Sequence, residues 1–180
     1  MRRISCYLWL CAAVAMPLLL RAQTEAESTL THVGQEAHAF ECTTLDGKKV
    51  DLKSLRGKVV LINFFATWCG PCMAEMPHLE KQVWQKFKDK NFVLLAIGRE
   101  HENKEISDFP QKHGVTFPVA GDPKRKIYSQ YAKQYIPRNY VIDAEGKIVF
   151  QSVGYTETEF AKMVEVIQKE LQKKAPEEKK

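Results

Sequence analysis

The sequence lacks the closely spaced cysteines of a disulfide scaffold and has no cluster of metal-ligating side chains. Its five cysteines include a single pair at CxxC spacing, Cys69 and Cys72. A zinc site needs two further ligands at comparable spacing, and the sequence has neither a second CxxC nor a clustered pair of histidines. A small secreted protein built on disulfides carries more cysteines in a shorter chain. The sequence therefore predicts no metal site and no disulfide scaffold.

The sequence also lacks a strong excess of charge. Its 27 basic and 22 acidic residues give a formal net charge of +5. Arg2, Arg3 and Arg21 lie in an N-terminal segment that we expect to be removed, and without them 24 basic residues stand against 22 acidic ones. A balance near +2 does not indicate a nucleic-acid partner. With 44% hydrophobic and 27% charged residues, the 180-residue chain is typical of one globular domain.

The apolar run at the N-terminus is short for a membrane-spanning helix of about 20 residues. The stretch from Ile4 to Leu20 follows two arginines and is interrupted by Pro17, a pattern typical of a secretory signal. We predict a signal peptide over residues 1–22, with an uncleaved membrane anchor as the alternative. The remaining predicted parts are a flexible spacer over residues 23–32, a folded domain over 33–174 and a disordered tail over 175–180.

Residues 58–77, KVVLINFFATWCGPCMAEMP, predict a buried strand, a turn and a helix in that order. The nearly continuous β-branched and aromatic run at 59–65 is typical of a strand that is covered on both faces. Pro71 falls in the first helical turn, where a missing N–H has no intrahelical partner to lose. Beyond it, apolar residues recur every three or four positions and share one side of the helix. These residues are Met73, Met76, Leu79, Val83 and Phe87.

The helix start gives the two cysteines different chemistry. Cys69 lies at or just before the helix N-terminus, where unpaired backbone N–H groups and the helix dipole favour a thiolate. A thiolate is the species that attacks disulfides, and Cys72 lies one turn later, within reach to close a small ring. We therefore expect the pair to cycle between dithiol and disulfide.

This stretch resembles the active site of the thioredoxin superfamily, whose signature WCGPC stands at residues 68–72. Pro77 matches the proline that kinks the active-site helix of that family. Residues 40–72 resemble the exported TlpA/ResA branch, and the resemblance covers about residues 33–171. It implies an α/β, thioredoxin-like fold with a mixed central sheet flanked by helices, an N-terminal β-hairpin and a central insertion. It also implies a thiol-disulfide oxidoreductase with no cofactor besides the Cys69–Cys72 disulfide.

The rest of the pattern agrees with this fold. Asp46-Gly47, between short extended segments, predicts the N-terminal hairpin. Residues 92–98 predict a second buried strand, parallel to the first because a helix connects them. The insertion is expected between Glu100 and Tyr135. A second hairpin that turns at residues 144–147 and an amphipathic helix from Thr156 to Lys174 complete the domain.

Glu75 is a candidate acid/base. Thioredoxin has a buried aspartate six residues before its first cysteine, whereas this chain has Asn63 there, and an asparagine does not titrate. ResA-like proteins have a glutamate at the position that matches Glu75. The resemblance therefore implies that Glu75 exchanges a proton with Cys72 when the mixed disulfide is released. The alternative is an ordinary solvated carboxylate on the helix surface.

Ile136-Pro137 resembles the cis-proline step of thioredoxins, which faces the cysteine pair and offers backbone hydrogen bonds to an extended substrate. The resemblance places Ile136 and Pro137 in the substrate-binding surface, together with Trp68, Gly70 and Pro71. The indole of Trp68 is expected to wall one side of the cysteine pair.

Two further residues leave alternatives open. Arg138 replaces the threonine that is common after this proline, and its charge either lowers the pKa of Cys69, favours acidic partners or is simply exposed. Cys42 is expected to be a half-buried strand residue, with pairing with a partner or a role as a third redox thiol as the alternatives.

These features predict a monomeric, exported reductase of protein disulfides, located in the periplasm, with tethering to the inner membrane as the alternative. The branch suggests apocytochrome c as a substrate and a membrane electron donor of the DsbD or CcdA type. One rival is a peroxiredoxin-like peroxidase, because the pattern of residues 117–123 resembles that relative. The other is a non-enzymatic metal or cytochrome-assembly chaperone, against which the short CxxC spacing argues.

Overall fold

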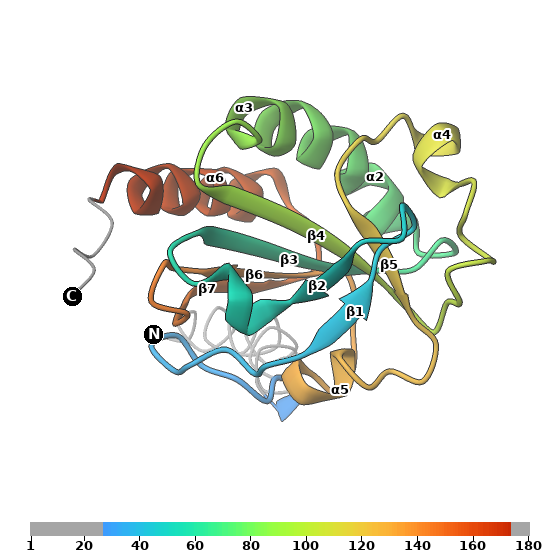
Figure 1. Cartoon of the computed structure of the whole chain (residues 1–180), viewed down its shortest axis with the longest axis horizontal. Coiled ribbons are helices and arrows are strands. Elements are labelled where there is room, and N and C mark those ends of the chain that lie inside the picture. The colour runs from blue at the N-terminus through green and yellow to red at the C-terminus, as the bar shows by residue number, and fades with distance from the viewer. Residues whose placement is uncertain (1–26, 174–180) are drawn as a thin grey trace, which may run out of the picture.

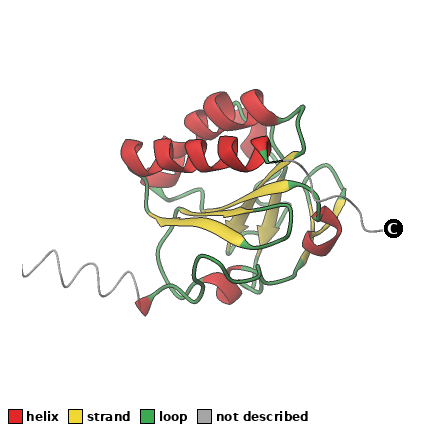
Figure 2. Cartoon of the chain, turned by 90° about the vertical axis from the view of Figure 1, so that its left-hand side faces the viewer, coloured by secondary structure: helices red, strands yellow, loops and turns green. Residues whose placement is uncertain are grey.

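The computed structural model describes residues 27–173. A five-stranded mixed sheet forms its centre, and helices cover both faces (Figures 1 and 2). The spatial order of the strands is β5-β4-β3-β6-β7. β4 runs parallel to both β3 and β5, whereas β6 runs antiparallel to β3 and to β7. The strands are β3 (Val59–Phe65), β4 (Phe92–Arg99), β5 (Val119–Asp122), β6 (Arg138–Ile142) and β7 (Ile148–Val153). The predicted thioredoxin-like α/β fold is confirmed.

The helix that follows the cysteines and the C-terminal helix lie on one face of this sheet (Figure 1). They comprise α2 (Gly70–His78), α3 (Gln85–Phe87) and α6 (Glu157–Gln172). The helix predicted after the cysteines is continuous through α2 and α3, but its middle, η2 (Leu79–Trp84), is a π-helical segment that begins two residues after Pro77. Thr156 caps α6, because its side chain accepts the N–H of Glu159.

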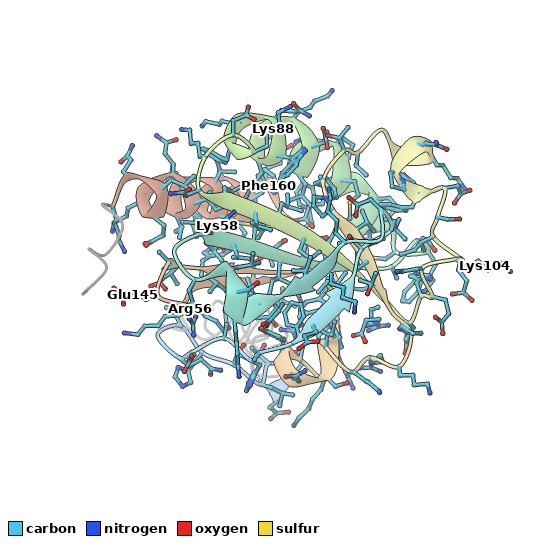
Figure 3. All side chains as sticks on the ribbon, viewed as in Figure 1. Arg56, Lys58, Lys88, Lys104, Glu145 and Phe160 are labelled. Carbon is cyan, nitrogen blue, oxygen red and sulfur yellow. A yellow bond between two sulfur atoms is a disulfide. The ribbon has the colours of Figure 1, made fainter. Side chains whose placement is uncertain are left out.

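Side chains of β3 alternate between two cores, since successive residues of a strand point to opposite faces. Leu61 and Phe65 pack under α2 and α6, in the cluster that also holds Phe160, which Figure 3 labels near α6. Ile62 and Phe64 pack on the other face with Tyr128 of α5 (Tyr128–Tyr131). Asn63 has the parity of Leu61 and Phe65, so this alternation places a polar side chain on the α2 face.

The predicted N-terminal hairpin is present as β1 (Glu41–Thr43) and β2 (Lys49–Asp51), followed by a 3-10 turn, η1 (Leu52–Leu55). It packs on the α5 face and its end reaches β5 through a bridge between Thr44 and Ala120. The predicted insertion supplies α4 (Phe109–His113), β5 and α5.

The described part of the predicted spacer is folded, so that expectation was wrong for residues 27–32. Leu30 donates its N–H to the carbonyl oxygen of Tyr131 at 3.0 Å, and Thr29 forms a β-bridge with Ala132. Ser28 and Thr31 are buried. Composition alone suggested a linker because the segment is polar. In the structure, its hydroxyls form hydrogen bonds with side chains of the sheet. We refer to residues 28–31 as the strap.

The predicted signal peptide at residues 1–22, the first residues of the predicted spacer and the predicted tail at 175–180 lie outside the described residues. Between residues 27 and 173, no helix has the length and apolar character needed to cross a membrane.

Candidate active site

Cys69 and Cys72 form a disulfide at the start of α2, with their Cα atoms 5.2 Å apart. Cys69 is the N-cap of the helix, and its sulfur accepts the backbone N–H of Cys72 at 3.3 Å. Cys69 is 6% exposed and Cys72 is fully buried. Cys69, whose sulfur faces the helix N-terminus, is thus also the more accessible residue of the pair, as expected of an attacking cysteine with a protected partner.

The predicted cis-proline lies opposite the pair. The Ile136–Pro137 peptide bond is cis. The carbonyl oxygen of Ile136 is 3.7 Å from the sulfur of Cys69. Ile136 is half-buried, whereas Gly70 and Pro71 are exposed beside the disulfide. The structure therefore brings the predicted binding residues of two distant segments to one place.

Trp68, next to Cys69 in the chain, is a large exposed side chain that is 64% accessible. The guanidinium carbon of Arg99 lies 5.5 Å from the centre of its ring, within cation–π range. Just before it, the N–H of Thr67 donates to Nε2 of His101 at 3.1 Å. Burial lowers the pKa of His101, and a neutral ring is what this acceptor role requires. Arg99 and His101 thus hold the turn that carries the predicted wall.

Glu75 is buried, with 1% of its surface exposed, so the solvated alternative was wrong. Its Oε2 accepts the amide N–H of Asn63 at 3.0 Å and its Oε1 accepts the amide N–H of Asn139 at 2.6 Å. Asn63 also donates to Oδ1 of Asn139 at 2.8 Å, which closes a ring of three side chains. Burial raises the pKa of Glu75 to about 7, while the two amide donors act in the opposite direction. Glu75 can therefore gain or lose a proton near neutral pH.

Asn139 was missed in the sequence, although a signal for it exists. Asn63 and Asn139 are direct partners in the antiparallel register of β3 and β6. Both share strand parity with apolar residues of the α2 face, Leu61 and Val141. A polar residue at an inward position of each strand, opposite the other, marks a buried polar network.

Arg138 is not an exposed arginine: it is 1% exposed and heads the largest fully buried side chains. Being next to Asn139 on β6, it points to the other face of the sheet. There its guanidinium donates to Ser28 and Thr29 of the strap and to the carbonyl oxygens of Gln134 and Tyr135.

Cys42 is half-buried, as predicted, and free. It pairs with Val50 in the hairpin register. Burial, aided by the charge of Asp122, raises the pKa of its thiol to about 11. This environment disfavours a thiolate and makes Cys42 a poor redox partner. Within residues 27–173, no group of three or more His, Cys, Asp or Glu side chains is placed to hold a metal ion.

Comparison with known proteins gives concordant matches. Residues 33–151 match the model of the AhpC/TSA family. The thiol-disulfide oxidoreductase ResA of Bacillus thuringiensis (strain Al Hakam) is 37% identical over 129 residues, which cover 72% of this chain and 74% of ResA. The thioredoxin-like protein YneN of Bacillus subtilis (strain 168) is 37% identical over 123 residues, which cover 67% of this chain and 71% of YneN.

Two solved structures share the architecture. A solution structure from Bacteroides thetaiotaomicron, described as a candidate protein disulfide isomerase, is 42% identical with a TM-score of 0.78, and the match covers 81% of this chain and 94% of that one. A crystal structure from Chlorobium tepidum, described as a candidate thiol:disulfide interchange protein DsbE, is 29% identical with a TM-score of 0.68. That match covers 78% of this chain and 98% of its counterpart.

Proposed function

The chain belongs to the AhpC/TSA family and, within it, is a thiol-disulfide oxidoreductase of the ResA type; on that premise we propose that it reduces protein disulfides in the periplasm. The observation that carries the proposal is the Cys69–Cys72 pair at the N-terminus of α2, 3.7 Å from the backbone oxygen that precedes a cis-proline. That arrangement offers a nucleophile and a backbone docking site for an extended substrate side by side.

In the proposed reaction, the Cys69 thiolate attacks one sulfur of a substrate disulfide. A mixed disulfide forms, and the other substrate sulfur leaves as a thiolate that takes up a proton. Cys72 then gives its proton to the Glu75 carboxylate, one helical turn away, and attacks the sulfur of Cys69. The mixed disulfide breaks, the second substrate sulfur leaves as a thiolate that takes up a proton, and the enzyme holds the Cys69–Cys72 disulfide. Two electrons have passed from the enzyme dithiol to the substrate.

The direction of electron flow is inferred from the Gly70-Pro71 dipeptide between the cysteines. It resembles that of reducing thioredoxins, whose reduction potential is about −270 mV, against about −120 mV for the oxidant DsbA. A reductase in an oxidising compartment needs a supply of electrons, for which we propose a membrane donor of the DsbD or CcdA type. Apocytochrome c, which carries two cysteines that must be reduced before haem attachment, is the substrate class that we propose.

The reduction potential of the pair tests this direction. The protein is equilibrated in glutathione or dithiothreitol buffers and the fraction of dithiol is measured by alkylation. A potential of about −270 mV is expected, whereas one of about −120 mV would identify an oxidase and overturn the proposal. In parallel, Cys69→Ser should abolish insulin reduction, and Cys72→Ser should accumulate the mixed disulfide. Cys42→Ser is the matched control and should retain full activity.

A peroxidase remains the second candidate, because the family match includes the segment at residues 117–123 that resembles peroxiredoxins. It would also use Cys69 as the attacking thiolate, with hydrogen peroxide as the oxidant. Peroxide consumption by the reduced protein, compared with insulin reduction under the same conditions, separates the two activities. The proposal expects insulin reduction to be the faster reaction by a wide margin.

A further inference from the structure

Among the residues that the structure describes, the guanidinium of Arg138 is a buried charge that donates to neutral oxygens. Its Nε donates to the carbonyl oxygen of Gln134 at 3.0 Å, and its Nη2 to the same oxygen at 2.8 Å. Nη1 donates to the hydroxyl of Thr29 at 2.9 Å. Nη2 also donates to the hydroxyl of Ser28 at 2.6 Å and to its carbonyl oxygen at 3.2 Å. None of the ion pairs within residues 27–173 includes Arg138.

A buried charge without a counter-ion is costly unless its donors are satisfied. Each hydrogen bond from Arg138 to a neutral oxygen therefore contributes more to stability than a hydrogen bond at the surface would. The planar fork of arginine suits this task, because it presents several N–H groups in fixed directions, which lysine does not. Within residues 27–173, these oxygens come from two segments besides β6 itself, where the side chain of Tyr140 is a further hydrogen-bond partner of Arg138. Each of the two segments is fixed by the charge it surrounds.

One of these segments is the loop that leads into the cis-proline. Its residues Gln134 and Tyr135 immediately precede Ile136, whose carbonyl oxygen faces the sulfur of Cys69. Tyr135 has a left-handed backbone with φ 69°, a conformation that is uncommon for a residue with a side chain. Its carbonyl oxygen also accepts the hydroxyl of Tyr128 at 2.7 Å. The loop thus depends on side-chain donors to hold its shape.

The other segment is the strap, which reaches the same loop by its own backbone. The carbonyl oxygen of Ser28 accepts the N–H of Lys133 at 2.8 Å, and Thr29 forms a bridge with Ala132. Farther along, the side chain of Gln151 on β7 donates to the carbonyl oxygen of Thr31 at 3.1 Å. The strap is therefore fastened by its own backbone at the two residues that Arg138 contacts, and again at Thr31.

We propose that Arg138 is a positioning residue that, with Ser28 and Thr29 of the strap, holds the cis-proline loop in the shape that binds a protein substrate. This inference rests on the proposed disulfide reductase function, because it assigns the loop a substrate. It extends that function to residues 28–31, which lie more than 30 positions before the cysteines in sequence. Arg138 acts through the loop backbone and not on the sulfurs.

The test compares side-chain variants of the full chain. Ser28→Ala combined with Thr29→Val removes two hydroxyl acceptors and keeps the backbone contacts, and Arg138→Lys keeps the charge but loses the fork. Ser129→Ala, an exposed serine on nearby α5, is the matched control. We expect the KM for insulin to rise about tenfold in both test variants, the size expected when hydrogen bonds to a buried charge are lost. Reduction of a small aromatic disulfide, which needs only the exposed edge of Cys69, should change less than twofold.

Amide hydrogen exchange supplies a second readout that does not need activity. In the hydroxyl variant, the amides of residues 132–136 should exchange at least tenfold faster, while those of β3 and β4 stay unchanged. If the KM and the exchange rates both match the control, the inference is overturned. If the unaltered protein fails to reduce insulin, the proposed function fails, and the exchange data still decide whether Arg138 and the strap hold the loop. If Arg138→Lys does not fold, the hydroxyl variant carries the test.

Discussion

Replacing Glu75 by glutamine should change how the stability of the oxidised protein depends on pH. Glu75 is 1% exposed, and burial raises its pKa to about 7 from an ordinary value of 4.5. Below about pH 4.5 the carboxyl is protonated in both the folded and the unfolded chain, so its burial does not reduce the free energy of unfolding through charge. As the pH rises through 7, the folded protein must hold a buried carboxylate that the unfolded chain exposes to water. Stability is therefore lost as the pH rises.

The size of the loss follows from the two pKa values. The difference between about 7 and 4.5, at about 1.4 kcal/mol per pH unit, corresponds to about 3 kcal/mol. This is a large part of the 5–15 kcal/mol or so that stabilises an ordinary domain. Glu75→Gln removes the charge but keeps the volume. The amide group of the glutamine also disturbs the hydrogen bonds with Asn63 and Asn139, but that effect does not vary with pH. The dependence of the unfolding free energy on pH therefore reports the carboxylate alone.

The assay is urea unfolding of the oxidised protein at several pH values between 4.5 and 8.5. The disulfide removes the thiols of the pair from the titration, and subtraction of the two curves cancels the histidines. Relative to Glu75→Gln, the wild type should lose between about 2 and about 3 kcal/mol from pH 5 to pH 8.5, because part of the loss is already present at pH 5. Glu165→Gln, an exposed position on α6, is the control and should run parallel to the wild type. A difference that varies by less than about 1 kcal/mol over this range would refute the assignment of a raised pKa to Glu75.

Three other predictions concern the surroundings of the pair. Asn139→Leu removes an N–H donor from the carboxylate, so the pKa of Glu75 should rise above about 7, which carboxyl carbon chemical shifts would show as a later titration midpoint. Cys42, with a pKa raised to about 11, holds about one thiolate per thousand molecules at pH 8, so iodoacetamide should alkylate it far more slowly than the reduced catalytic pair. His101→Ala removes the acceptor of the Thr67 N–H, so that amide should exchange faster and insulin reduction should slow several-fold.

Much of the fold could be predicted because its signals are local. The buried run of β3, the helix spacing after Cys72 and the Asp46-Gly47 turn each follow from rules that act over a few residues. The resemblance carried by WCGPC then supplied the connections between them. Within the site, the cysteine pair and the cis bond before Pro137 were predicted on the same basis, and both are where the resemblance placed them.

The parts that were missed depend on contacts between distant segments. His101 shows no ligand spacing in sequence, and it meets Thr67 only because the loops after two parallel strands emerge at the same edge of the sheet. Residues 28–31 read as a linker because their composition is polar. Their hydroxyls are used by an arginine about 110 positions later, which no local pattern reports.

The two residues after the cis-proline, which are adjacent on β6, support different parts of the site. Arg138 and Asn139 are adjacent, so the pleat of β6 sends them to opposite faces of the sheet. One fixes the loop through the strap, and the other donates to Glu75 beside the cysteines. Because a slip of one residue would exchange the two faces, the register between β3 and β6 is what keeps the buried cation away from the buried acid. The cation and the acid therefore do not pair with each other, and Glu75 keeps a pKa near 7 because no opposite charge within residues 27–173 favours the carboxylate.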